Sequence, residues 1–129
     1  MKKKIYVVAA VIKIREKMLI MQRGGTGILN NKWEFPGGKI EYGETIQETI
    51  VREIKEELDV NIKTSNIIGI TEYEYPFAII NLTFINCVLL DSKESIKLNV
   101  HKDMKWITSD QFDEIDWAEA DVEILNKLK

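Results

Sequence analysis

The sequence contains a single cysteine, Cys87, and a single histidine, His101. One cysteine excludes an internal disulfide and any zinc site built from cysteine ligands. One histidine excludes a metal centre with several histidine ligands. No apolar run approaches the roughly 18–20 residues that a membrane-spanning helix needs, so we expect no membrane partner.

Positive charge is also scarce. Eighteen Lys and Arg stand against 21 Asp and Glu, which gives a formal net charge of -3. Proteins that bind duplex nucleic acid carry a broad basic surface, because the phosphate backbone supplies most of the attraction. We therefore expect no duplex nucleic acid partner.

The 129 residues fit one domain, residues 1–129, and 45% of them are hydrophobic, which is enough to form a core. Lysines at positions 2–4 precede the apolar residues 5–12 and resemble the start of a signal peptide. The stretch continues with charged residues and shows no convincing cleavage site. We therefore interpret it as a buried strand and expect a cytoplasmic protein.

Strand and helix patterns alternate along the chain. Apolar and β-branched segments predict strands at 5–14, 18–23, 79–90 (the longest) and 105–108, with one or two more within 61–74. Helical patterns cover 45–58 and 120–128, with a short turn at 109–112. This alternation predicts an α/β (α+β) fold with a mixed β-sheet between helices.

Residues 45–58 carry the most regular helical pattern. Apolar residues recur at Ile46, Ile50, Ile54 and Leu58, with Val51 beside them. Glu44 or Thr45 can cap the start of this helix. Gly37 and Gly38 form a predicted turn just before it, where backbone groups can approach a ligand closely.

Six glutamates lie on this helix and its approach: Glu41, Glu44, Glu48, Glu53, Glu56 and Glu57. A solvated helix face is the ordinary interpretation of such a cluster. At about 100° per residue, however, Glu57 falls inside the apolar arc and Glu53 lies at its edge. Together with Glu56 they share an arc about 100° wide that is partly turned toward the core.

Carboxylates packed this closely repel one another, and a buried one also loses hydration. Arg52 can pair with Glu48 or Glu56 at i,i+4 spacing, but one guanidinium cannot neutralise three carboxylates. A hard divalent cation would supply the remaining charge, and Mg²⁺ is a natural choice. A structural acidic cluster without a metal is the alternative. Because Mg²⁺ often binds substrate phosphates, the pattern indicates phosphate chemistry.

Residues 38–60 resemble the Nudix box, G-x5-E-x7-R-E-U-x-E-E-x-G-U, where U is aliphatic. The matching residues are Gly38, Glu44, Arg52, Glu53, Ile54, Glu56, Glu57 and Val60. Asp59 replaces the last glycine. Residues 31–39, the expected turn at 72–76, Trp106 and the segment around Ala120 resemble the MutT branch of the same family, so the resemblance covers essentially the whole chain.

This resemblance implies an α/β/α sandwich and hydrolysis that depends on Mg²⁺ or Mn²⁺. In the MutT branch, water attacks a nucleoside triphosphate and gives the monophosphate and pyrophosphate. We therefore expect a small-molecule nucleotide substrate, 8-oxo-dGTP or a related modified nucleotide, and a role in nucleotide-pool sanitation and DNA repair. A (d)CTP-preferring pyrophosphohydrolase of the same branch and a non-catalytic nucleotide-sensing domain are the alternatives. The sequence allows a monomer or a homodimer.

The resemblance also implies roles for individual residues. Arg52 would orient Glu53, and Glu44 would support the turn. Glu53 or Glu56 would act as the catalytic base, and the sequence does not choose between them. The implied metal ligands are the carbonyl of Gly38 and the side chains of Glu53, Glu56 and Glu57.

The implied substrate-binding residues are Arg23, Phe35, Lys39, Tyr75, Leu82 and Asp121. Arg23 would contact phosphate, because a guanidinium matches phosphate geometry. Lys39 is a second phosphate candidate or a solvated loop lysine. The three apolar residues would form a slot for the base or pack in the core. Asp121 would read the base edge, as an acceptor when ionised or a donor when protonated, or would cap a helix.

Four positions depart from the pattern of the relatives or tempt a functional interpretation. Asp59 occupies a left-handed position that favours glycine, at a cost of about 1 kcal/mol at most. Val100 stands where relatives often place a glutamate, which leaves a second metal and the choice of base open. We interpret His101 as structural. Ala78 replaces a base-contacting arginine of some relatives, which weakens the expectation that the substrate carries a guanine base.

Overall fold

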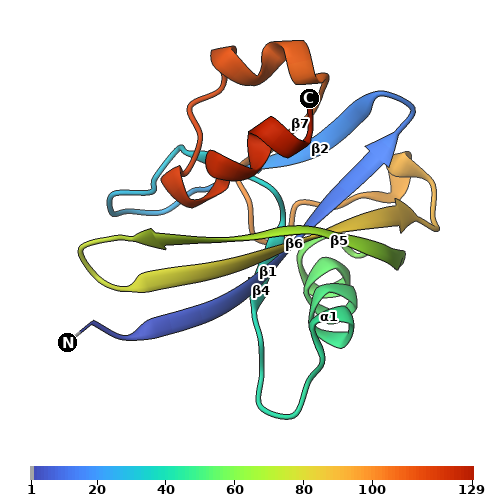
Figure 1. The fold of residues 1–129 in the computed structure, drawn as a ribbon. Coiled ribbons are helices and arrows are strands. Elements are labelled where there is room, and N and C mark those ends of the chain that lie inside the picture. Colours follow the sequence, from blue (N-terminus) through green and yellow to red (C-terminus); the bar gives the residue numbers. More distant parts are fainter. Residues whose placement is uncertain (1) are drawn as a thin grey trace.

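The computed structural model describes residues 2–129, which form a mixed sheet, one α-helix and several 3-10 turns (Figure 1). The strands are β1 (Lys4–Ile14), β2 (Lys17–Gln22), β3 (Trp33–Glu34), β4 (Gly37–Lys39), β5 (Ile62–Glu74), β6 (Ile79–Leu89) and β7 (Asp103–Ile107). The helical segments are α1 (Ile46–Leu58), η1 (Lys93–Ser95), η2 (Ser109–Glu114), η3 (Glu119–Asp121) and η4 (Glu123–Lys127). The predicted positions of the strands and of α1 are confirmed to within a few residues. β5 is one strand of 13 residues and is longer than β6, which has 11.

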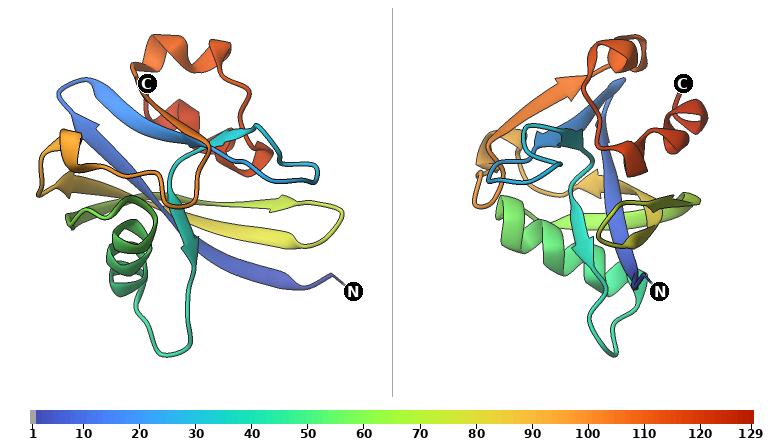
Figure 2. Two further views of the ribbon diagram at one scale, coloured as in Figure 1. Left: turned by 180° about the vertical axis from the view of Figure 1, so that it is seen from behind. Right: turned by 90° about the vertical axis from the view of Figure 1, so that its left-hand side faces the viewer.

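β1 is the central strand. It pairs in parallel with β6 and antiparallel with β2 and β4, in the order β3-β2-β1-β6-β5, and β7 pairs with β2. This arrangement confirms the predicted mixed sheet. The helix α1 packs on one side of the sheet and the C-terminal 3-10 turns lie on the other, as the views from behind and from the side also show (Figure 2).

The unbroken apolar sequence of β1 follows from burial on both faces. Val8, Ala10 and Ile12 belong to the hydrophobic cluster that includes the apolar face of α1. Ala9 and Val11 belong to a second cluster that includes the C-terminal segment. Fixing α1 against β1 in this way also fixes the direction of the glutamates on the helix.

Both ends of α1 have defined caps. Thr45 is the N-cap: its hydroxyl accepts from the Glu48 amide at 3.0 Å, and the Glu48 carboxylate accepts from the Thr45 amide at 2.9 Å. Glu48 therefore does not pair with Arg52, one of the two pairings that the spacing allowed. At the other end, Asp59 adopts φ 57° and ψ 35°, the left-handed conformation expected there. None of the helices between residues 2 and 129 has the length and apolar character to span a bilayer.

The turn predicted at Gly37 and Gly38 is wrong, because both residues belong to strand β4. Gly37 pairs with Ala9 and Gly38 with Val8 of β1. A Cβ on Gly37 would overlap the Val8 carbonyl oxygen, so only glycine permits this approach. The glycine pair thus brings the backbone of β4 close to both β1 and α1.

The closing helix predicted at 120–128 is replaced by two 3-10 turns. The Ala120 amide donates to the Tyr75 hydroxyl at 2.9 Å, and the Ala120 carbonyl accepts from the Thr71 hydroxyl at 3.2 Å. These contacts with β5 and its turn hold the segment, while backbone bonds such as Asp121 N–H to Ala118 C=O have 3-10 spacing. The second helical layer of the expected sandwich therefore consists of 3-10 turns.

Asp59 gives a test of the helix terminus. Asp59→Gly removes the cost of a left-handed side chain and loses only exposed pairs with Lys55 at 3.5 Å and Lys97 at 3.4 Å. We expect the free energy of unfolding, measured by urea titration, to rise by up to about 1 kcal/mol. Asp59→Ala keeps the Cβ and loses the carboxylate, so it should lower that free energy. A glycine variant less stable than wild type would show that the ion pairs outweigh the backbone strain.

Candidate active site

Arg52 is the centre of a polar network on α1. Its Nε and Nη2 donate to the two carboxylate oxygens of Glu44 at 2.6 and 2.9 Å. Its Nη1 donates to Glu53 Oε1 at 2.9 Å, and Nη2 also donates to the Lys39 carbonyl at 3.2 Å. One guanidinium thus connects the helix, the loop before it and the end of β4.

Glu44 holds the loop that precedes α1. Its Oε1 accepts from the Glu41 amide at 2.9 Å and from the Thr49 hydroxyl at 3.0 Å. The hydrogen bond from Arg52 is the main cause that lowers the pKa of Glu44 to about 2. Glu44 therefore stays ionised at neutral pH. The roles of Glu44 and Arg52 in catalysis stay predictions.

Glu53 and Glu57 turn toward the sheet. Glu57 is only 9% exposed, as its place in the apolar arc predicted, and its Oε1 has no hydrogen-bond partner among residues 2–129. Burial is the main cause that raises the pKa of Glu57 to about 9, and the nearby carboxylates of Glu53 and Glu34 raise it further. A Cβ on Gly38 would overlap the Glu53 carboxylate, so the glycine leaves space for that side chain.

Glu56 is placed differently, with its side chain 59% exposed and its carboxylate 3.3–3.4 Å from Arg52 Nη1. No group of three His, Cys, Asp or Glu side chains between residues 2 and 129 is arranged to hold a metal ion as it stands. The donors nevertheless fit a hard divalent cation. They are carboxylate oxygens, and the buried Glu57 Oε1 has no partner in the part of the chain that the structure describes. The metal-binding role of Gly38, Glu53, Glu56 and Glu57 stays a prediction.

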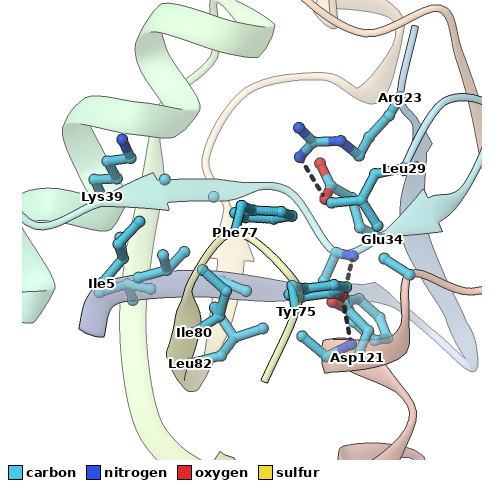
Figure 3. Close-up of a pocket in the computed structure, with 18 residues that line it drawn as sticks. Ile5, Arg23, Leu29, Glu34, Lys39, Tyr75, Phe77, Ile80, Leu82 and Asp121 are labelled. Atoms are coloured by element: carbon cyan, nitrogen blue, oxygen red, sulfur yellow. Dashed lines mark hydrogen bonds and ion pairs between the residues drawn. The ribbon is translucent and has the colours of Figure 1, made fainter. Parts of the chain in front are cut away.

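A cavity of about 390 Å³ opens beside β1 and β4 (Figure 3). All six predicted substrate-binding residues line it: Arg23, Phe35, Lys39, Tyr75, Leu82 and Asp121. Apolar side chains make up much of the remaining wall, including Ile5, Leu29, Phe77 and Ile80. The volume and the mostly apolar lining with a few polar groups are typical of small-molecule sites.

Three of the lining residues also pack in the core. Phe35 stacks on Trp117 with ring centroids 5.3 Å apart, and Tyr75 and Leu82 are 3% and 5% exposed. The ring of Phe77 stacks on that of Tyr75, with ring centroids 5.2 Å apart and an angle of 10° between the planes. These three residues therefore pack in the core and also line the cavity. Their role as a slot for the base stays a prediction.

Asp121 lies deep in the cavity and is only 3% exposed. Its Oδ2 accepts from the Phe35 amide at 2.8 Å. Burial is the main cause that raises the pKa of Asp121 well above its usual value, which favours a protonated carboxyl. The alternative that Asp121 caps a helix is wrong, because Val122 occupies the N-cap of η4.

A second, polar cavity of about 140 Å³ adjoins the first. Arg23, Glu34 and Gly37 line both cavities, and Arg23 Nη1 donates to Glu34 Oε1 at 3.2 Å (Figure 3). The polar cavity reaches Glu57, and Gly24, Val100 and His101 complete its wall. The Arg23–Glu34 pair therefore marks the boundary between an apolar and a polar compartment.

Sequence reasoning missed Glu34 and Phe77. The available signal for Glu34 was a carboxylate inside the otherwise apolar segment 33–35. The signal for Phe77 was an aromatic residue in a turn, and the structure leaves it 55% exposed. Single residues of this kind give no periodic pattern, so they stand out only once the cavity is seen.

The chain is similar to known proteins over its whole length. Residues 3–128 match the NUDIX domain. Over 83 residues the chain is 37% identical to the 8-oxo-dGTP diphosphatase of Escherichia coli (strain K12), a match that spans 64% of each protein and so less than two thirds of that relative. Over 123 residues it is 29% identical to the CTP pyrophosphohydrolase of the same organism, covering 95% of this chain and 90% of that protein.

Solved structures of similar fold support the same family. The solution NMR structure of the DNA mismatch repair protein MutT, of the Nudix hydrolase family, from methicillin-resistant Staphylococcus aureus 252 has a TM-score of 0.76 and 39% identity, covering 99% of this chain and 97% of that one. The MutT protein from Methanosarcina mazei Go1 has a TM-score of 0.87 at 20% identity, covering 98% and 94%, and so shows the fold alone. These findings confirm the predicted resemblance and fold class.

Gly38 offers a test of the contact between β4 and Glu53. Gly38→Ala places a methyl group where the Glu53 carboxylate lies, and a flexible side chain can move away. We expect the variant to fold, with a Tm within a few degrees of wild type, but to lose at least half of the Tm increase that Mg²⁺ produces. Gly37→Ala is the matched control, because its methyl group would meet the backbone of β1 and should destabilise the fold itself. If Mg²⁺ raised the Tm of Gly38→Ala as much as that of wild type, the contact between Gly38 and Glu53 would not be needed for cation binding.

Glu57 predicts how the stability of the metal-free protein depends on pH. Its pKa is about 9 in the fold against 4.5 when unperturbed, so between these values the native state holds a proton that the unfolded state releases. The free energy of unfolding should therefore fall as pH rises, by at most about 1.4 kcal/mol per unit. Urea titrations in EDTA at pH 6, 7 and 8 measure this slope. Glu57→Gln should flatten it, and an unchanged slope in the variant would assign the effect to another group.

Proposed function

Because the chain belongs to the NUDIX family, we propose that it is a hydrolase that cleaves a nucleoside triphosphate to the monophosphate and pyrophosphate. We propose 8-oxo-dGTP or a related modified nucleotide as the substrate. The observation that carries this proposal is the junction of two cavities, one apolar and ending at Asp121, the other polar and ending at Glu57. A nucleotide needs both environments at once, because its base is flat and apolar and its phosphates are charged.

The apolar cavity supports recognition of a purine. Leu82 and Ile80 line it, and the stacked rings of Tyr75 and Phe77 form part of its wall. A protonated Asp121 carries one donor and retains acceptor capacity, so it suits a base edge that presents both an acceptor and a donor. With Oδ2 engaged by the Phe35 amide, the other oxygen of Asp121 is left to meet the base.

The polar cavity and the face of α1 beside it support phosphate chemistry. Arg23 would bind a phosphate oxygen, and Lys39, the last residue of β4, would add positive charge at the same cavity. Arg52 holds one oxygen of Glu53, which leaves the second oxygen free to accept a proton from the attacking water. Glu56, exposed beside the same guanidinium, is the alternative base.

A divalent cation, Mg²⁺ or Mn²⁺, held by Glu53, Glu56, Glu57 and the Gly38 carbonyl would supply charge neutralisation and a water of lowered pKa. The residues of the chain then have separate tasks. Glu44 keeps Arg52 in place, Arg52 keeps Glu53 in place, and Arg23 aligns the phosphate chain. We propose nucleotide-pool sanitation in the cytoplasm, a form of DNA repair, as the role of this activity.

The (d)CTP-preferring pyrophosphohydrolase is the second candidate. The observation that favours it is the similarity to the CTP pyrophosphohydrolase of Escherichia coli over 95% of this chain. Ala78, in the turn beside the cavity, also provides no polar group toward a guanine. Both candidates share the reaction and the phosphate site, so the base alone distinguishes them.

A panel of nucleotides tests the proposal. With Mg²⁺ present, we expect pyrophosphate release and a kcat/KM for 8-oxo-dGTP at least tenfold above those for dCTP, CTP and the other canonical nucleotides. Glu53→Gln should lower kcat by about 10²–10⁴-fold if Glu53 is the base. Glu48→Gln is the matched control, because Glu48 lies on the same helix but serves the N-terminal cap.

Each other outcome is informative. A tenfold preference for a cytosine nucleotide would replace the leading substrate by the second candidate. Binding of nucleotides without any turnover would indicate a sensing domain. Unchanged turnover in Glu53→Gln would remove Glu53 from the role of base and leave Glu56.

A further inference from the structure

His101 is buried against the Arg23–Glu34 pair. Its side chain is only 5% exposed, and its Nε2 lies 3.1 Å from Glu34 Oε2. The other oxygen of Glu34, Oε1, accepts from Arg23 Nη1 at 3.2 Å. The carboxylate of Glu34 is therefore held from both sides, by a buried imidazole and by a half-exposed guanidinium.

Paired strands hold these three residues: Glu34 lies in β3, Arg23 follows β2 and His101 precedes β7. β2 lies between β3 and β7, with Met21 paired to both Glu34 and Met104. Arg23 directly follows β2. Its amide donates to the Lys32 carbonyl and its carbonyl accepts from the Asn31 amide, at 2.9 Å each. The residue after His101 donates its amide to the Gln22 carbonyl at 2.9 Å. The alignment of the side chains is thus set by paired strands rather than by a loose loop.

The His101 ring has one side-chain hydrogen-bond partner among the described residues, the carboxylate of Glu34. Its Nδ1 is buried without a hydrogen-bond partner among the described residues, so the ring makes its side-chain hydrogen bond to Glu34 alone. A histidine that merely joins two parts of a fold would normally satisfy both nitrogens. The contact with Glu34 is therefore the side-chain hydrogen bond that orients the His101 ring.

Holding Glu34 matters because of where it lies. Its carboxylate borders both cavities, near the path that a phosphate chain would take, and a free carboxylate there would repel the phosphates. With Oε2 bound to His101 and Oε1 bound to Arg23, Glu34 instead holds the Arg23 guanidinium in one orientation. A long arginine side chain that is fixed before the ligand arrives loses less rotamer entropy on binding.

We propose that His101 is a positioning residue, which holds Glu34 and through it aims Arg23 at the phosphates of the substrate. The inference rests on the proposed function, because it assumes that a phosphate chain passes Arg23. It assigns His101 more than the structural part that the sequence alone favoured. His101 touches neither base nor phosphate in this scheme and acts only through Glu34.

Two substitutions at position 101 separate positioning from packing. His101→Phe keeps a large buried ring and removes the hydrogen bond, whereas His101→Gln keeps a side-chain N–H for Glu34. We expect His101→Phe to raise the KM for the preferred nucleotide by about 5–20-fold, the effect of losing roughly 1–2 kcal/mol of binding, with kcat changed less than threefold. His101→Gln should restore most of the wild-type KM.

A double-mutant cycle with Arg23→Ala gives the decisive comparison. If His101 acts through Arg23, then His101→Phe should change KM by less than twofold once Arg23 is absent. A KM increase of the same size in both backgrounds, or a lowered Tm with an unchanged KM, would overturn the inference and leave His101 as a packing residue.

The same cycle can be measured without turnover. Inorganic triphosphate with Mg²⁺, titrated by calorimetry, reports phosphate binding alone. If wild type hydrolyses no nucleotide but the triphosphate affinities still show coupling between positions 101 and 23, the proposed function fails and the positioning role stands. If the four proteins bind triphosphate without coupling, or wild type binds none, the positioning role is overturned whatever the nucleotide panel shows.

Discussion

The bidentate pair between Arg52 and Glu44 is the interaction on which the geometry of the site depends. Two short hydrogen bonds, 2.6 and 2.9 Å, fix the plane of the guanidinium and so decide where its remaining donor points. That donor reaches Glu53 at 2.9 Å. The crowding of carboxylates on α1 is therefore relieved in two ways, by one guanidinium shared among several acids and by burial that raises the pKa of Glu57 and favours its neutral form.

The central strand β1 separates the two halves of the candidate site. β1 is covered by α1 on one face and by the C-terminal segment on the other, so the glutamates and the apolar cavity belong to opposite sides of the same strands. β4 passes between them, and Gly37 lines both cavities because it carries no side chain. The two glycines of β4 would thus leave room for a ligand to contact both sides.

Local patterns were predictable and tertiary effects were not. The periodicity of residues 45–58 predicted both the helix and the burial of Glu57, since both follow from the geometry of a single helix. The strand at Gly37 and the 3-10 turns near Ala120 depend on partners far away in the sequence, β1 and Tyr75. The six cavity residues come from five separate segments, so only the resemblance to a known family could group them. Glu34 and its link to His101 had no sequence signal beyond one acid in an apolar segment.

The raised pKa of Glu57 would make cation binding at this site depend on pH. The same buried oxygens that a divalent ion would need are the ones whose pKa lies near 9, so ion and proton compete for one place. In the neutral range, each ion that binds must displace about one hydrogen ion into the solvent, and its apparent affinity should weaken by up to about tenfold for each unit of added acidity. If a cation binds there as proposed, its apparent affinity would therefore rise with pH, with the buried carboxyl of Glu57 as the titrating group.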